Sequence, residues 1–555
     1  MNPTLSSFCG RVQSRGSFPF SLFSFPVLAL TLLLLLPAAT AQSPAYDLVI
    51  TGGRILDGSG NPWYTGDVAI REGRIVAVGP ICGAATPGCA GKAKRVLDAK
   101  GLYVAPGFID VHSHSEGGIK TRGAADNYLF DGVTSIISGN CGGSDVELAP
   151  VFADLRKTGI SINYGTLIGH NSVRRVVMGS DQRDPTPEEQ ARMEALVEKA
   201  MREGAVGFST GLIYIPGTYS KTPEVVGLAR AAARHRGVYA SHMRDEELEI
   251  DAAIDEAIHI GREAGMPVEI SHFKNSSKKM WGYSKATIAR VERARAEGID
   301  VTVDQYPYTA SSTNLGVLLP SWALAGGNEQ MRKRLVDPAT RKKIIAEMKD
   351  MLHREAGFKD YDYAVVARAG SDASLEGQSI ARITREKGKK GLDAEIATIL
   401  ELMDKGGAQM IYHKMSEEDV ERIMRFPYAM VAADGGIQEF GRGRPHPRSY
   451  GTNARVLARY VREKGVIRLE EAIRKMTSLP AQRFRLADRG LVRPGMWADI
   501  VVFDAATVRD AATFERPHAY AEGFAFVLVN GEVVIESAKH TGARPGQVLL
   551  GPAAQ

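Results

Sequence analysis

The middle of the chain alternates between short β-branched runs and longer stretches with helical spacing. Eight candidate strands are Gly107–Val111, Val133–Ser138, Ile160–Ile168, Ala205–Ser209, Gly237–Ser241, Pro267–Ser271, Asp300–Asp304 and Tyr428–Ala432. Helical patterns such as 250–264 separate most of them. Strands joined through helices become parallel, because each helix returns the chain to the same edge of the sheet. The pattern predicts an α/β fold of the TIM-type (β/α)8 barrel class, with a doubly wound open sheet as the alternative.

Both ends of the chain have a different pattern. Residues 44–105 and 481–540 read as short strands with Gly-rich turns, and Asn530-Gly531 is a hairpin signal. We expect these two segments to form one small β-sandwich domain. The barrel then occupies residues 106–480, and residues 541–555 are a tail.

The connection between the seventh and eighth strands is too long for a single crossover. This segment, about 309–426, contains its own helical patterns, such as 392–403. A helix after Ser416 has Asp419 three residues on, which resembles a capping box with Asp in place of Glu or Gln. We predict an insertion that covers the barrel mouth as a lid and shapes the choice of substrate.

Residues 1–41 contain no Asp or Glu. Arg11 and Arg15 precede an apolar run from about 18 to 37, and Ala39-Thr40-Ala41 supplies a small-x-small cleavage signal. This pattern predicts a secretory signal peptide and therefore a periplasmic or extracellular protein, with a retained membrane anchor as the alternative. Cys82 and Cys89 lie seven residues apart in a Gly/Pro-containing loop and could form a disulfide in an oxidising compartment.

Charge provides little information about partners. The 555-residue chain has a formal net charge of +5 without a block of Lys or Arg. This balance supports neither nucleic acid nor an anionic membrane as a partner, and no second spanning segment is evident.

Two histidines close the first barrel strand in the run Pro106-Gly107-Phe108-Ile109-Asp110-Val111-His112-Ser113-His114. Residues two apart in a strand face the same side, so His112 and His114 can hold one metal ion between them. A metal at the carboxyl end of a barrel strand can make a nucleophile from water.

Further candidate ligands follow other strands. Cys141 comes after the second strand, His242 after the fifth, His272 after the sixth and Asp434 after the eighth. The carboxyl ends of barrel strands meet at one mouth, so these side chains should converge. Imidazole and thiolate suit Zn²⁺, and the Asp434 carboxylate can take a proton from water and return it to a leaving amine.

These residues resemble a known family. The motifs are Pro106–His114, Ser138–Gly143, Gly211–Tyr214, Ser241–Arg244, Ser271–Lys274, Asp304–Tyr308, Asp434-Gly435 and His446–Arg448, with Thr477–Ala481 and Ala498-Asp499 near the end. Over about residues 46–535 the chain resembles the N-acyl-D-amino-acid deacylases (D-aminoacylases) of the metal-dependent amidohydrolase superfamily. The Gly139–Gly142 element marks this subfamily, because relatives use a carboxylated lysine in place of the cysteine.

The resemblance implies a tightly bound zinc ion on Cys141, His242 and His272. It implies a weaker second site on His112, His114 and the bridging Cys141. Asp434 would be the general base and acid. The α-carboxylate of the substrate would meet Lys274, Tyr306 and Arg448.

Some of these assignments have alternatives. Tyr308 could replace Tyr306, and Arg444 could replace Arg448. His170 is expected near the site without being a ligand, or else as a packed core histidine.

The activity implied is zinc-dependent hydrolysis of N-acyl-D-amino acids, which are small molecules, to a carboxylate and a free D-amino acid. One alternative is an exported amidohydrolase that acts on dipeptides with a D residue or on cyclic amides. Another is an exported binding protein that has lost catalysis. A missing ligand or a missing Asp434 would favour the binding protein, and none is missing.

Overall fold

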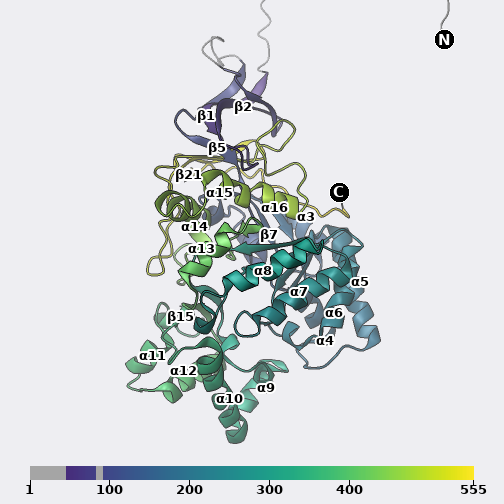
Figure 1. Cartoon of the computed structure of the whole chain (residues 1–555), viewed down its shortest axis with the longest axis vertical. Coiled ribbons are helices and arrows are strands. Elements are labelled where there is room, and N and C mark those ends of the chain that lie inside the picture. Colours follow the sequence, from purple (N-terminus) through teal and green to yellow (C-terminus); the bar gives the residue numbers. More distant parts are fainter. Residues whose placement is uncertain (1–44, 83–91, 555) are drawn as a thin grey trace, which may run out of the picture. The chain divides into compact units, whose positions relative to one another are not determined.

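The structure is a computed structural model that describes residues 45–82 and 92–554 (Figure 1). The predicted signal peptide at 1–41 lies outside these ranges. Within them, no helix combines the length and the apolar character needed to cross a membrane.

Eight parallel strand positions form the barrel in chain order. They are β6 (Phe108–Asp110), β7 (Val133–Ser138), β8 (Asn163–Thr166) with its continuation β9 (Ile168–Gly169), β10 (Gly207–Gly211), β11 (Val238–His242), β12 (Val268–Ile270), β13 (Val301–Gln305) and β17 (Ala429–Val431). The chain after β17 closes the ring against the chain after β6. The Asp434 amide donates to the His112 carbonyl at 2.9 Å, and the His114 amide donates to the Gly435 carbonyl at 2.7 Å. This closure confirms the TIM-type barrel and excludes the open sheet.

The helices between the strands lie side by side around the barrel (Figure 1). They include α3 (Leu148–Thr158), α4 (His170–Met178), α5 (Pro187–Glu203), α6 (Thr222–Ala233), α7 (Ile250–Ala264) and α8 (Ser284–Ala296). Helix α5 begins with a capping box, in which the Glu189 amide donates to the Thr186 hydroxyl and the Thr186 amide donates to the Glu189 carboxylate. The apolar faces of these helices are buried in the largest apolar core of the molecule.

Both ends of the described chain build one branched sheet. From the amino-terminal side come β1 (Tyr46–Ile55), β2 (Tyr64–Arg71), β3 (Arg74–Gly79), β4 (Ala93–Asp98) and β5 (Tyr103–Pro106). From the carboxyl-terminal side come β18 (Ile500–Phe503), β19 (Phe524–Val529), β20 (Glu532–Glu536) and β21 (Lys539–His540). The antiparallel pair β5–β18 joins the two halves, and the sheet branches at β1. Both chain ends therefore share one β domain as predicted, but its described strands form a single branched sheet and not the two sheets of a sandwich. Cys82 is disulfide-bonded, whereas Cys89, its expected partner, lies outside the described residues.

The insertion has a sheet and a core of its own. Strands β14 (Ser311–Asn314), β16 (Gln409–Tyr412) and β15 (Ala364–Arg368) pair antiparallel in that order. Its helices are α9 (Gly327–Val336), α10 (Pro338–Asp350), α11 (Ile380–Glu386) and α12 (Leu392–Asp404). Their apolar side chains form a core separate from that of the barrel.

Helix α13 (Glu417–Arg425) belongs with the barrel, because it contacts α8, β13 and β17. The predicted capping box at its start is wrong. The Ser416 side chain makes no capping hydrogen bond, and the Asp419 carboxylate instead accepts from the amides of Gly282 and Ser284. The Asp419 carboxylate therefore binds a distant segment of the chain and does not cap the helix as its spacing predicted.

Candidate active site

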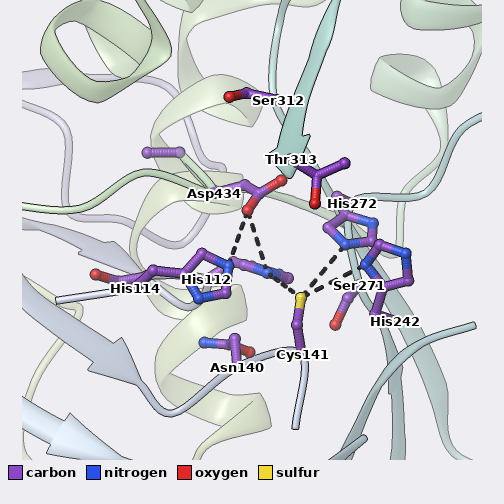
Figure 2. A network of polar contacts seen from close by, with 12 residues as sticks. His112, His114, Asn140, Cys141, His242, Ser271, His272, Ser312, Thr313 and Asp434 are labelled. Carbon is purple, nitrogen blue, oxygen red and sulfur yellow. Dashed lines mark hydrogen bonds and ion pairs between the residues drawn. The ribbon is translucent and has the colours of Figure 1, made fainter. Parts of the chain in front are cut away.

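The predicted ligands and Asp434 meet at one mouth of the barrel (Figure 2). His112 and His114 follow β6, Cys141 follows β7, His242 ends β11 and His272 follows β12. Asp434 follows β17. The structure thus brings together all six side chains that the strand-end pattern singled out.

Cys141 lies at the centre of the group. Its Sγ is 3.3 Å from His112 Nε2, 3.6 Å from His242 Nδ1 and 3.6 Å from His272 Nε2. Bond lengths to zinc of ~2.3 Å for sulfur and ~2.0–2.1 Å for nitrogen put two ligands of a tetrahedral site about 3.5 Å apart. The sulfur–nitrogen spacings therefore fit a zinc ion, and the ligand atoms of Cys141, His112 and His272 also all lie within 4.8 Å of one another.

A second group adjoins the first. His114 Nε2 lies 3.2 Å from Asp434 Oδ1, and His112 Nε2 lies 3.5 Å from the same oxygen. His112 thus faces both the thiol and the carboxylate. The side chains of His112, His114 and Asp434 are close enough to one another to hold an ion.

The backbone of the site is strained at three positions. Cys141, His272 and Asp434 have positive φ angles of 52°, 37° and 49°. Residues other than glycine adopt this region rarely, and such strain concentrates at functional sites. Next to Cys141, a Cβ on Gly142 would lie 2.0 Å from Asn171 Oδ1, so only glycine fits there.

Electrostatics favour a thiolate next to protonated imidazole. Burial acts to raise the pKa of Cys141, but His112, His114 and His242 bring it well below its usual value. Burial acts to lower the pKa of His112, but Asp304, Cys141 and Asp434 raise it well above its usual value. The thiolate is the form of cysteine that binds metals, and a bound cation would take the place of the imidazolium proton.

Asp304 orients two of these ligands and was given no role by the sequence analysis. Its Oδ2 lies 3.0 Å from His112 Nδ1, and its Oδ1 accepts from the His272 amide at 2.9 Å. A carboxylate behind a ligating imidazole fixes the tautomer and the ring orientation. The sequence did contain a signal, because Asp304 stands at the carboxyl end of a barrel strand as the ligands do.

Glu246 is a second supporting carboxylate that the sequence analysis missed. Its Oε1 is 3.0 Å from His272 Nδ1 and accepts from Lys274 Nζ at 2.5 Å. Lys274 Nζ also lies 2.8 Å from His272 Nδ1, and all three side chains are buried. Glu246 follows β11 in an irregular segment, so no periodic pattern marks it.

Arg448 lies directly against Asp434. Its Nη1 is 2.9 Å from Asp434 Oδ2, and its guanidinium stacks 4.5 Å from the centre of the Tyr306 ring. The Tyr306 hydroxyl donates to Met415 Sδ. Burial acts to raise the pKa of Asp434, but Arg448, His112 and His114 hold it well below its usual value, so the carboxylate is ionised.

Among the described residues, neither of the alternatives Tyr308 and Arg444 forms a hydrogen bond or ion pair with Asp434. Tyr308 packs against His446 and Phe514, and Arg444 is exposed and donates to the Glu515 carbonyl. His170 is a packed core histidine whose Nε2 lies 2.8 Å from Glu224 Oε1.

Two cavities open on the site. The first, here called the insertion cavity, measures about 860 Å³ and lies between the ends of β11–β13 and the insertion. The second, here called the arginine cavity, measures about 660 Å³ and is lined by six arginines. Asp434, Tyr214 and Thr313 border both cavities, and Thr313 Oγ1 donates to the Tyr214 hydroxyl at 3.0 Å.

A barrel with an imidazole–thiolate group at its strand ends and an ionised carboxylate opposite defines a metal-dependent hydrolase. Sequence comparison agrees with this class. The chain belongs to the amidohydrolase family, whose model matches residues 95–535.

Three curated relatives from Alcaligenes xylosoxydans xylosoxydans match nearly the whole chain. A D-aminoacylase is 37% identical over 93% of this chain and 99% of its own length. An N-acyl-D-glutamate deacylase is 38% identical over 91% of this chain and 96% of its own length. An N-acyl-D-aspartate deacylase is 35% identical over 91% of this chain and 95% of its own length. These similarities agree with the resemblance inferred from the motifs.

Solved structures agree with the sequence relatives. A crystal structure of D-aminoacylase superposes with a TM-score of 0.77 at 35% identity, covering 91% of this chain and all of that one. The N-acyl-D-glutamate deacylase of Bordetella bronchiseptica, complexed with zinc and a phosphonate inhibitor, matches with the same TM-score, identity and coverage. A D-hydantoinase at 16% identity and a TM-score of 0.55 shares the fold alone.

Proposed function

We propose that this protein is a zinc-dependent deacylase that hydrolyses N-acyl-D-amino acids to a carboxylate and a free D-amino acid. The observation that carries the proposal is the Cys141 sulfur surrounded by three imidazoles, with the ionised Asp434 carboxylate beside them. Relatives that are named as deacylases of this substrate class support it.

Cys141, His242 and His272 would hold the tightly bound zinc ion, and His112 and His114 would share Cys141 in a second, weaker site. A bound zinc ion supplies Lewis acidity that activates a water molecule and the scissile carbonyl. A solved structure of D-aminoacylase is described as having a binuclear metal centre.

Asp434 is the proton carrier in this proposal. Its Oδ1 faces His112 and His114, while its Oδ2 is held by Arg448, so Oδ1 is the oxygen available to the reacting atoms. It would accept the proton of the attacking water and deliver it to the leaving nitrogen. Arg448 keeps the carboxylate ionised until that transfer.

Arg448, Lys274 and Tyr306 would bind the α-carboxylate of the substrate. Arg448 offers a planar fork that suits a carboxylate, and Lys274 adds a second positive charge. Lys274 Nζ now donates to Glu246 and Arg448 Nη1 contacts Asp434, so a bound carboxylate would share both donors with these partners. Selection of the D-enantiomer rests on the named relatives.

We also propose export to the periplasm or the extracellular medium, through cleavage of the signal peptide at 1–41. The acid-free apolar amino terminus supports this. Cell fractionation together with amino-terminal sequencing of the exported protein is the test. A cytoplasmic protein that begins at Met1 would contradict the proposal.

The decisive assay compares N-acetyl-D- and N-acetyl-L-amino acids as substrates of the mature protein. We expect turnover of the D-enantiomers, loss of that turnover after chelation, and recovery when zinc is added back. Folded, zinc-loaded protein that hydrolyses neither enantiomer would overturn the proposal. Equal turnover of both would overturn the D selectivity alone.

A further inference from the structure

We propose that the arginine cavity binds a carboxylate of the substrate other than the α-carboxylate, so that the enzyme prefers N-acyl-D-amino acids with two carboxylates. This inference rests on the proposed function and names the substrate class of the same site. The structural basis is the surplus of arginine beside Asp434.

Six arginines line the cavity, and they come from separate parts of the chain. They are Arg122, Arg175, Arg368, Arg442, Arg444 and Arg448. The only carboxylates in the same lining of described residues are Asp434 and Glu439. Positive charge therefore exceeds negative charge in this cavity.

Most of this charge is not neutralised within the protein. Arg448 pairs with Asp434, and Arg442 pairs with Glu439 at 2.9 Å. The other four arginines form no ion pair with any residue in the described ranges. Unpaired guanidinium groups around a cavity attract and hold an anion.

Arg122 adds an observation that points to a ligand. Its Nε is buried and has no hydrogen-bond partner among the described residues. A buried donor without a partner costs free energy, which a bound acceptor would recover. Arg448 Nε is likewise buried and has no hydrogen-bond partner among the described residues.

The insertion cavity differs in its charge. Four of its five lysines and arginines have carboxylate partners, in the pairs Lys274–Glu246, Lys414–Glu247, Arg354–Asp350 and Arg244–Glu256. The fifth is Arg175, which borders both cavities. Its wall from the insertion is largely apolar, with Leu318, Trp322 and Met351 among its side chains. The unpaired positive charge therefore belongs mainly to one of the two cavities.

The reacting amide must lie at Asp434, which borders both cavities. One arm of the substrate can then extend into the arginine cavity and the other into the insertion cavity. An arm that ends in a carboxylate would meet planar guanidinium groups, which bind carboxylates with two parallel hydrogen bonds. The second carboxylate can belong either to the amino-acid side chain or to the acyl group.

Matched substrate pairs test the inference and separate these two sources. N-acetyl-D-glutamate is compared with its neutral isostere N-acetyl-D-glutamine, and N-succinyl-D-leucine with N-butyryl-D-leucine. All four carry an α-carboxylate, so the two members of each pair differ in charge only at the second carboxylate. We expect kcat/KM to be about tenfold or more higher for the charged member of one pair, and that pair identifies the source.

Two substitutions link the preference to the cavity. Arg368→Gln and Arg122→Gln should each lower the charged-to-neutral ratio of kcat/KM about fivefold or more, because each removes a charged donor. Arg368 is exposed on β15, so its loss leaves the fold intact even if the half-buried Arg122 proves structural. Arg382→Gln is the matched control, since this exposed arginine of the insertion pairs with Glu386 and lines neither cavity.

The outcomes are distinguishable. Equal kcat/KM within both pairs by an active enzyme would overturn this inference and leave the proposed function standing. A charged-substrate preference that both arginine variants retain would also overturn it, because the preference would then arise elsewhere. Zinc-loaded protein that hydrolyses none of the four substrates or N-acetyl-D-leucine would overturn the proposed function and this inference together.

Discussion

The barrel mouth and the insertion form the two sides of the site in different ways. At the mouth, His112, Cys141, His242 and His272 stand at the ends of hydrogen-bonded strands, and Asp304 and Glu246 hold the imidazoles from behind. The insertion folds around its own apolar core and contributes Ser312–Asn314 to both cavities. The comparison suggests that chemistry depends on the strand ends, whereas substrate choice depends on the parts that cover them.

Asp434→Asn should have the largest effect, because it removes the proposed proton carrier and retains the shape of the side chain. We expect kcat to fall by about 10²–10⁴-fold, with zinc content unchanged. Steady-state kinetics and metal analysis measure the two quantities. Asp255→Asn, at an exposed ion pair on α7, is the control. Full activity in zinc-loaded Asp434→Asn protein would remove Asp434 from its proposed role.

Asp304→Asn tests whether the barrel mouth depends on its supporting carboxylates. Loss of the charge behind His112 should weaken zinc binding at the proposed second site, which His112 shares with His114 and Cys141, by about 10–100-fold. Competition with a chelator measures the affinity, and thermal unfolding of the apoprotein reports separately on stability. Unchanged zinc affinity would mean that the imidazoles are held by packing alone.

Glu246→Gln tests whether metal binding and substrate binding can be separated, because Glu246 contacts both the candidate ligand His272 and Lys274. If Lys274 binds the α-carboxylate, losing its buried partner should alter KM by about tenfold, since a buried charge-assisted hydrogen bond contributes about 1.5–3 kcal/mol. The matched control is Glu247→Gln at the neighbouring, less buried pair with Lys414. Equal KM changes in both variants would show that the effect is not specific to Glu246.

Ile344→Ala should have the smallest effect on the metal. Ile344 is fully buried in the core of the insertion, so the cavity left behind should cost about 2–5 kcal/mol of stability. Zinc affinity should stay within about threefold, because Ile344 packs in a core separate from that of the barrel, and separate sites that share no partners respond independently. Denaturant unfolding and chelator competition measure these two quantities. A large fall in zinc affinity would show that the insertion also supports the metal ligands.

Much of the fold and the site was predictable because it follows local patterns. The barrel strands lie within a few residues of the predicted ones, and helix α7 has the predicted bounds. The convergence of the candidate ligands could be predicted because every barrel strand delivers its last residues to the same edge. Glu246 could not be found in this way, since the side chains that give it a role come from a different strand.

Predictions from local sequence spacing were wrong where a residue distant in the chain binds the same side chain. Asp419 has the spacing of a capping residue, yet it binds the Gly282 and Ser284 amides, which lie more than 130 residues away in the chain. The same limit applies to Lys274, whose buried contact with Glu246 no spacing could indicate.

The sequence by itself determined the βα alternation, the residues at the strand ends and the zinc-compatible donor types, because these depend on periodicity and on residue chemistry. Only the tertiary structure decided which carboxylate stands behind which imidazole, and where the arginines gather. Arg122, Arg368 and Arg444 lie far apart along the chain, and folding alone brings them to the wall of one cavity. Unpaired charges cluster in this way through long-range packing, which no local pattern in the chain encodes.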